Sequence, residues 1–216
     1  MAITFDAISG TNTFANSGAA KTVTLTIAED ADLVVAVFSV NAVPDAITFD
    51  GTGMTLAKAK SNGAGLLAQV YYMLKADLPG AGTYTLSIDP SAASFGAMGC
   101  FSLIGVKQAA PEATGEGSST SSQASWANNI TSITDGAWGV DAIGLNDRTG
   151  TVDGGQVERF DVLDGSAQGM FASTKPIASA GLTTMGWTPS TASPYAQAIA
   201  AFAPAAAFSK QLIMVS

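Results

Sequence analysis

Short stretches of the chain alternate between apolar and polar residues. In residues 21–27, Val23, Leu25 and Ile27 alternate with threonines, and residues 82–88 repeat this pattern. A period of two is typical of a β-strand, in which successive side chains point to opposite faces of a sheet. We therefore expect both stretches to be strands with one buried face and one face in water.

Other stretches are apolar at nearly every position. They are Leu33–Val40, Leu66–Leu74, Ala97–Val106 and Ala196–Ala203. Such runs indicate central strands that are covered on both faces. The alanine-rich Ala196–Ala203 also has helical propensity, but its place in the repeat described below favours a strand.

Turn-forming residues separate these stretches at short intervals. We expect Asp50–Gly53 to join Ile47–Phe49 to Met54–Lys60 as a hairpin, and Asn62-Gly63 to join that strand to the next one. No long helical periodicity with capping residues is present. The pattern predicts an all-β fold, a two-sheet antiparallel sandwich of the jelly-roll-like type.

The sequence also contains an internal pseudo-repeat. Residues 81–103 resemble residues 180–202 at an offset of 99 residues without a gap, and the identical positions include turn residues such as Pro90 and Pro189. A unit of this length exceeds the roughly 20–50 residues of a solenoid repeat. The repeat therefore indicates two equivalent halves that share one core.

This repeat gives the expected organisation of the chain. Residues 1–204 form one β-sandwich, whose halves span about residues 1–111 and 126–204. The Gly/Ser/Thr-rich residues 112–125 join the halves. Residues 205–216 follow as a C-terminal arm.

Several strand and turn motifs occur in a recognisable order. They include ITFD (Ile3–Asp6), DLVVAVFSV (Asp32–Val40), ITFDGTGMTL (Ile47–Leu56) and AQAIAAFAP (Ala196–Pro204). In this order the chain resembles jelly-roll or β-sandwich structural proteins encoded among the virion genes of tailed bacteriophages. The resemblance implies a virion or extracellular-recognition module with no known chemistry, and its motifs describe strands and turns rather than a site.

The charge of the chain bears on its partners. The 216 residues carry a formal net charge of −8, and the nine basic residues are scattered. A nucleic-acid binder needs a cationic footprint, so we expect no nucleic acid. We also expect no membrane contact, because no apolar stretch reaches the roughly 20 residues that cross a bilayer. The start of the sequence lacks the cationic and apolar pattern of a signal peptide.

The residues that usually carry chemistry are few. The chain has no histidine, and its one cysteine, Cys100, lies in an apolar run that favours a buried core residue. The best carboxylate pair is Glu158 and Asp161, whose odd separation places them on opposite faces of a strand. Residues 146–155 form a polar, Gly-rich loop that we interpret as an exposed loop rather than a calcium site. We therefore predict no enzyme activity, no cofactor and no metal.

Two surfaces remain as candidates for binding. Aromatic side chains could bind a surface glycan, and the candidates are Trp126, Trp138 and Tyr72. The apolar residues of the arm could add a strand to a neighbouring subunit or fold back on their own sandwich. The partner-binding candidates in the arm are Phe208, Leu212, Ile213, Met214 and Val215.

These observations lead to two hypotheses of function. The first is a non-enzymatic bacteriophage virion structural protein, a head decoration or a tail or collar component, that acts through contacts with other virion proteins and forms a homo-oligomer. Such a protein is made in the host cytoplasm and resides in the virion. The alternative is a glycan-binding module for attachment to the host surface.

Overall fold

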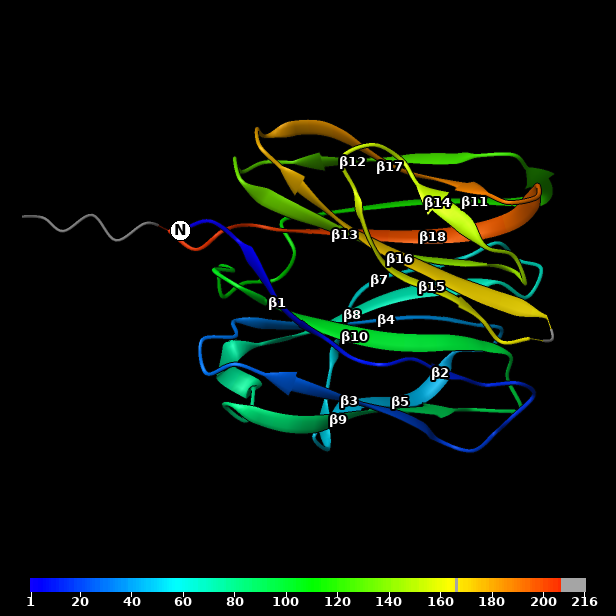
Figure 1. Ribbon diagram of the computed structural model, residues 1–216, viewed down its shortest axis with the longest axis horizontal. Coiled ribbons are helices and arrows are strands. Elements are labelled where there is room, and N and C mark those ends of the chain that lie inside the picture. Colours follow the sequence, from blue (N-terminus) through cyan, green and yellow to red (C-terminus); the bar gives the residue numbers. More distant parts are fainter. Residues whose placement is uncertain (166, 207–216) are drawn as a thin grey trace, which may run out of the picture.

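The computed structural model describes residues 1–165 and 167–206. These residues form antiparallel β-sheets, with one 3-10 turn at Lys75–Asp77. Figure 1 shows the sheets stacked as four layers. The predicted all-β antiparallel sandwich is therefore confirmed.

The first half of the chain forms two of these layers. Its inner sheet has the order β1 (Thr4–Ile8), β10 (Gly96–Ile104), β4 (Leu33–Val40), β8 (Leu67–Leu74) and β7 (Thr55–Ser61), with β2 (Asn12–Thr13) also paired to β10. Its outer sheet has the order β3 (Lys21–Ile27), β9 (Gly82–Pro90), β5 (Pro44–Phe49) and β6 (Thr52–Gly53).

The second half forms the other two layers. Its inner sheet has the order β11 (Ala113–Gln123), β18 (Ser193–Phe202), β13 (Ala137–Asn146), β16 (Gln168–Ile177) and β15 (Val157–Leu163). Its outer sheet has the order β12 (Trp126–Ser132), β17 (Gly181–Pro189) and β14 (Gly150–Val152).

The two halves have the same strand order. β1, β10, β4, β8 and β7 of the first inner sheet correspond in turn to β11, β18, β13, β16 and β15 of the second. β9 and β17 begin and end 99 residues apart, which is the offset of the sequence repeat. In each half the first strand pairs with the last and the chain crosses several times between the two sheets, as in a jelly roll. The two-sheet sandwich thus occurs twice, once in each half, and the expectation that residues 1–204 form a single sandwich is wrong.

The two inner sheets pack face to face, so the halves share a core. The largest cluster of buried apolar residues joins Val35, Val37 and Tyr72 of the first half to Ala198 and Phe202 of the second. Alanines at alternate positions of β18 lie in this interface, and their small side chains let the two sheets approach closely. Figure 1 shows these two layers at the centre of the stack.

Two sequence expectations about connections need correction. Met54–Lys60 does not form a hairpin with Ile47–Phe49, because β5 pairs with β9 and the short β6, and the chain then crosses into the inner sheet as β7. Residues 112–125 are not merely a joining segment. Most of them form β11, an edge strand that is hydrogen-bonded to β18 although its residues are small and polar.

Candidate functional site

An apolar groove lies at the end of the stack where Met1 lies. This end groove has a volume of about 790 Å³. Among its lining residues only Lys107, Thr134 and Asp135 have polar side chains. The other lining residues are Met1, Ala2, Ile3, Gly136, Trp138, Pro176, Ile177, Ala178, Ala203, Pro204, Ala205 and Ala206.

Three extended segments meet beside this groove. The Ala205 N–H donates to the Gly105 carbonyl at 2.7 Å, and the Lys107 N–H donates to the Ala203 carbonyl at 2.9 Å. The amine of Met1 donates to the Ala205 carbonyl at 2.8 Å. Residues 203–205 are therefore held between the start of the chain and the connector that follows β10. Gly105 has a φ of +80°, and a Cβ there would lie 2.3 Å from the Ala2 carbonyl oxygen, so the crossing requires glycine.

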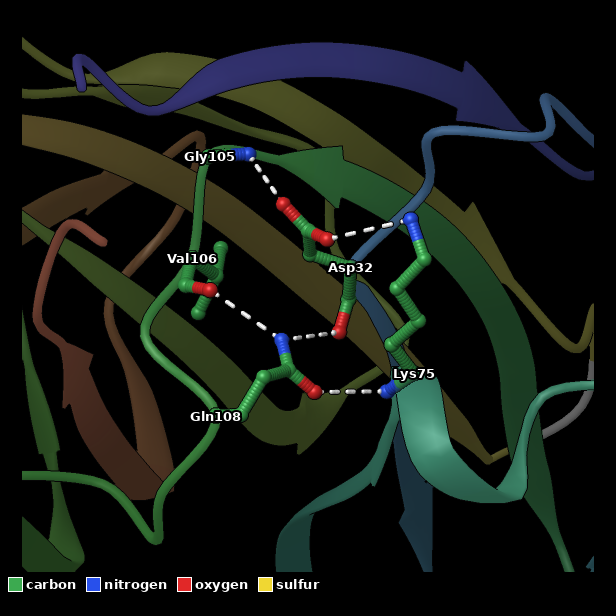
Figure 2. A network of polar contacts seen from close by, with 5 residues as sticks. All are labelled: Asp32, Lys75, Gly105, Val106 and Gln108. Carbon is green, nitrogen blue, oxygen red and sulfur yellow. Dashed lines mark hydrogen bonds and ion pairs between the residues drawn. The ribbon is translucent and has the colours of Figure 1, made fainter. Parts of the chain in front are cut away.

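A polar network fixes the connector on its other side (Figure 2). The Asp32 carboxylate accepts a hydrogen bond from Gly105 N–H at 2.7 Å and lies 3.5 Å from Lys75 Nζ. The Gln108 side chain donates to the carbonyls of Asp32 and Val106, both at 3.1 Å, and accepts from Lys75 N–H at 2.9 Å. A second hollow of about 660 Å³ borders this network and shares Ala205 and Ala206 with the end groove.

The loop that forms the opposite wall of the groove is also held by carboxylates. Glu112 Oε1 accepts from the N–H groups of Ile133 and Thr134 at 3.1 and 3.2 Å. Asp135 Oδ1 accepts from Ala180 N–H at 2.7 Å. The backbone of this loop is bonded, and the Ile133 side chain is 73% exposed.

An exposed apolar residue on a neighbouring strand enlarges this surface. Leu182 of β17 is 70% exposed, and it lies opposite Thr131, two residues before Ile133. Large apolar side chains that gather on a surface are typical of binding sites, whereas scattered ones are not. The groove is therefore an apolar surface for a partner, with the exposed Ile133 next in the chain to its lining residue Thr134 and Leu182 on the strand paired with β12.

Trp138 is the one glycan candidate that reaches this surface. Its side chain is half-buried at the start of β13 and lines the groove near Asp135 and Lys107. An aromatic face beside polar groups is the usual means of binding a sugar. The position of Trp138 therefore remains compatible with the glycan hypothesis.

The structure does not bring the other two aromatic candidates to the surface. Trp126 is 1% exposed, and its ring stacks on Tyr195 with centroids 5.0 Å apart. Tyr72 is 8% exposed and packs edge-on against Phe202 between the two halves. Neither ring offers a free face to a sugar, so both assignments as glycan contacts are wrong. Both side chains are core anchors.

The arm residues cannot be placed in the same way. Phe208, Leu212, Ile213, Met214 and Val215 lie outside the described residues. The last described residue, Ala206, is exposed and lines the groove.

A buried carboxylate lies elsewhere, between the two sheets of the second half. Asp141 of β13 is fully buried. One of its oxygens accepts from the N–H and the hydroxyl of Ser173, both at 2.7 Å. The other accepts from Trp187 Nε1 at 3.0 Å and Gln197 Nε2 at 2.8 Å. Burial raises the pKa of Asp141 to about 6, although these four donors act in the opposite direction.

This cluster is a polar core rather than an open site. Its hydrogen bonds continue from Ser173 to Gln156 at 2.8 Å and from Gln197 to Asn128 at 2.6 Å. The sequence analysis missed it. A signal was available, because Asp141 is the one charged residue within the apolar run of residues 137–145.

The pair Glu158 and Asp161 is arranged differently from the prediction. A bulge of β15 between Glu158 and Phe160 shifts the register, so that Glu158 lies opposite Ser173 and Asp161 opposite Phe171. These partners are two residues apart on β16, so the two carboxylates share a face. The prediction of opposite faces is wrong. Burial, followed by repulsion from Asp161, raises the pKa of Glu158, but Asp161 itself accepts from Gly150 N–H at 3.1 Å.

The remaining sequence expectations concern the cysteine, metal ligands and membrane-spanning segments. Cys100 is buried, as predicted, and burial raises the pKa of its thiol to about 12. Within residues 1–165 and 167–206, no three acidic or cysteine side chains lie close enough together to hold a metal ion. The described part of the chain also has no helix of the length and apolarity that would span a bilayer.

Comparison with known proteins gives no family for this chain. No protein-family model and no curated protein matches it. A recombinant pro-11S globulin of pumpkin is similar at a TM-score of 0.18 and 8% identity, covering 100% of this chain and 89% of that one. A pumpkin seed globulin has a TM-score of 0.17 and 7% identity, covering 93% of this chain and 83% of that one. Similarities this weak carry no argument about function.

Proposed function

We propose that this chain is a non-enzymatic structural protein of a bacteriophage virion, in the head decoration, tail or collar, and that it acts through protein–protein contacts. The end groove is the observation that carries the contact role, because it is an apolar hollow of about 790 Å³ and the exposed Ile133 directly precedes its lining residue Thr134. The virion setting rests on the sequence resemblance. Jelly rolls occur in capsid proteins, but the same fold serves other functions.

Mass spectrometry of purified particles tests the virion setting. We expect the chain in particles of the phage that encodes it, at a fixed ratio to the major head or tail protein. Its absence from intact particles would refute the proposal.

Charged substitutions in the groove surface test the contact role. Ile133→Asp together with Leu182→Asp should reduce incorporation into particles about tenfold or more, because a charge at the centre of an apolar contact is not compensated. Val43→Asp is the matched control. Val43 is 62% exposed, but it lies beyond the end of β4 that is far from the connector. The eight residues of β4 span roughly 25 Å, which separates Val43 from the groove end of the molecule. If the unmodified chain, the double variant and Val43→Asp are incorporated equally, the groove is not the contact surface.

A glycan-binding module is the second candidate, and the position of Trp138 favours it. Trp138→Ala should then abolish binding on a glycan array, whereas Trp126→Phe should leave binding unchanged because Trp126 is in the core. Quenching of tryptophan fluorescence by a sugar would give the same answer in solution. Array binding that survives Trp138→Ala would exclude this candidate.

A further inference from the structure

We infer that the end groove binds residues 207–216 of a second copy of this chain, so that copies join by exchanging these segments. The inference rests on the proposed contact role and adds to it the identity of the partner. It is independent of the virion setting.

The chain reaches the groove at the right place for such an exchange. Residues 203–205 are hydrogen-bonded to Gly105 and Lys107 on one side and to Met1 on the other. Figure 1 shows the chain after β18 passing beside the end of the molecule marked N. The exposed Ala206 lines the groove itself. Residue 207 therefore starts at the groove, and ten extended residues reach about 33 Å.

The composition of the segment matches the lining. Half of residues 207–216 are large and apolar, and they are Phe208, Leu212, Ile213, Met214 and Val215. The lining is apolar except for Lys107, Thr134 and Asp135. A volume of about 790 Å³ is in the range of sites that bury a ligand of several hundred daltons.

A second copy fits better than the segment's own chain. Ala206 already lies in the lining, so an own-chain segment would have to reverse its direction at once to lie in the same groove. Residues 207–211 are Ala-Phe-Ser-Lys-Gln, in which Ser209 is the one residue of a type that favours tight turns, and Gly, Pro, Asn and Asp are absent. The groove of a neighbouring copy requires no such reversal. Reciprocal exchange between two copies is the two-fold, self-complementary contact that closes a dimer.

Disulfide trapping between two different variants tests the inference. One full-length chain carries Ala178→Cys, an exposed position of the lining, and the other carries Ile213→Cys. The buried Cys100 does not compete for oxidation. On mixing and mild oxidation, we expect a disulfide between the two chains at a yield at least tenfold above a mixture of Val43→Cys and Ile213→Cys.

Three results distinguish the alternatives. A yield equal to that of the Val43→Cys control would overturn the inference. So would a disulfide found only within one molecule when both cysteines are placed in the same chain. Independently, Ile213→Asp should weaken self-association about tenfold by analytical ultracentrifugation, whereas Val43→Asp should leave it unchanged; equal dissociation constants would count against the exchange.

The outcome of this test can be separated from that of the proposed function. If the chain is present in particles but no disulfide forms between copies, the exchange is wrong and the virion role stands. If the disulfide forms but the chain is absent from particles, the exchange stands without a virion role.

Discussion

The ring of Phe160 occupies the space above Gly99 that any larger residue would fill. A Cβ atom at position 99 would lie 2.6 Å from Phe160 Cζ. Gly99 belongs to β10 of the first half and Phe160 to β15 of the second, so this contact crosses the interface between the inner sheets. A similar approach occurs between β13 and β4, where a Cβ on Gly144 would lie 2.7 Å from Ser39 Oγ. The halves therefore interlock through glycines.

Gly99→Ala should lower the free energy of unfolding by about 1–3 kcal/mol, because overpacking displaces a buried ring or the two sheets. Urea denaturation followed by tryptophan fluorescence measures this change. Gly10→Ala is the control, since nothing lies within 4 Å of a Cβ there. If both variants lose the same free energy, the contact with Phe160 is not the cause.

The sequence predicts the strands of this fold better than their connections. Alternation in residues 21–27 and the apolar run at residues 33–40 predict β3 and β4, because burial decides both patterns. Where burial is weak, the prediction fails. Residues 113–123 show no apolar face of their own, and only their hydrogen bonds to β18 make them a strand.

The candidate site is less accessible to prediction. The end groove joins residues 1–3, 134–138, 176–178 and 203–206, and no local pattern shows that these segments meet. Of the three aromatic candidates, only Trp138 lines the groove, since sequence alone does not tell a core ring from an exposed one. The bulge in β15 likewise changes the face of Glu158 without any glycine or proline to mark it.

Asp141 should make stability depend on pH. Its pKa of about 6 in the folded protein exceeds the roughly 3.9 of an unfolded aspartate, so the folded state binds the proton more tightly. Its contribution favours folding below about pH 4 and is lost as pH rises through 6, a change of about 3 kcal/mol. Asp141→Asn should flatten this part of the stability curve in urea denaturation from pH 4 to 7.5.

The matched control for Asp141 is Asp45→Asn, which changes an exposed carboxylate in β5. That variant should keep the pH dependence of the unmodified protein. A curve for Asp141→Asn that runs parallel to the unmodified one would show that Asp141 stays ionised over the whole range.

Glu116 pairs with two lysines across the interface. Its carboxylate oxygens lie 2.5 Å from Lys58 Nζ and 2.7 Å from Lys60 Nζ. Both lysines are on β7 of the first half, whereas Glu116 is on β11 of the second. Hydrogen bonds from both lysines lower the pKa of Glu116 to about 2. The pair therefore stabilises the fold above about pH 4.5, and this effect disappears as pH falls toward 2.

Glu116→Gln should nevertheless cost less than about 1 kcal/mol, because the three side chains are partly exposed and solvent screens them. The loss should shrink further in about 1 M salt. Urea denaturation at two salt concentrations measures both effects, with Glu29→Gln as the exposed control. A loss of several kcal/mol that is insensitive to salt would contradict this account.

The Gln108 side chain should determine how firmly the connector holds the end groove. It makes three hydrogen bonds, with the Asp32 and Val106 carbonyls and with Lys75 N–H (Figure 2). In Gln108→Ala the Lys75 N–H and the Asp32 carbonyl keep their hydrogen bond to each other at 3.0 Å. The loss of the Gln108 hydrogen bonds should therefore cost about 1 kcal/mol or less each. Exchange of the Lys107 and Ala205 amides should then accelerate several-fold, since both bond across the connector.

Hydrogen exchange followed by mass spectrometry resolves this local effect from global unfolding. Gln123→Ala provides the control, because Gln123 makes one exposed side-chain bond, to Ser119 at 3.3 Å. Faster exchange at Lys107 and Ala205 with unchanged exchange in β4 and β13 would place the effect in the connector. Uniform acceleration through all four sheets would instead show that Gln108 supports the whole fold. The groove would then open only when the core of the protein unfolds.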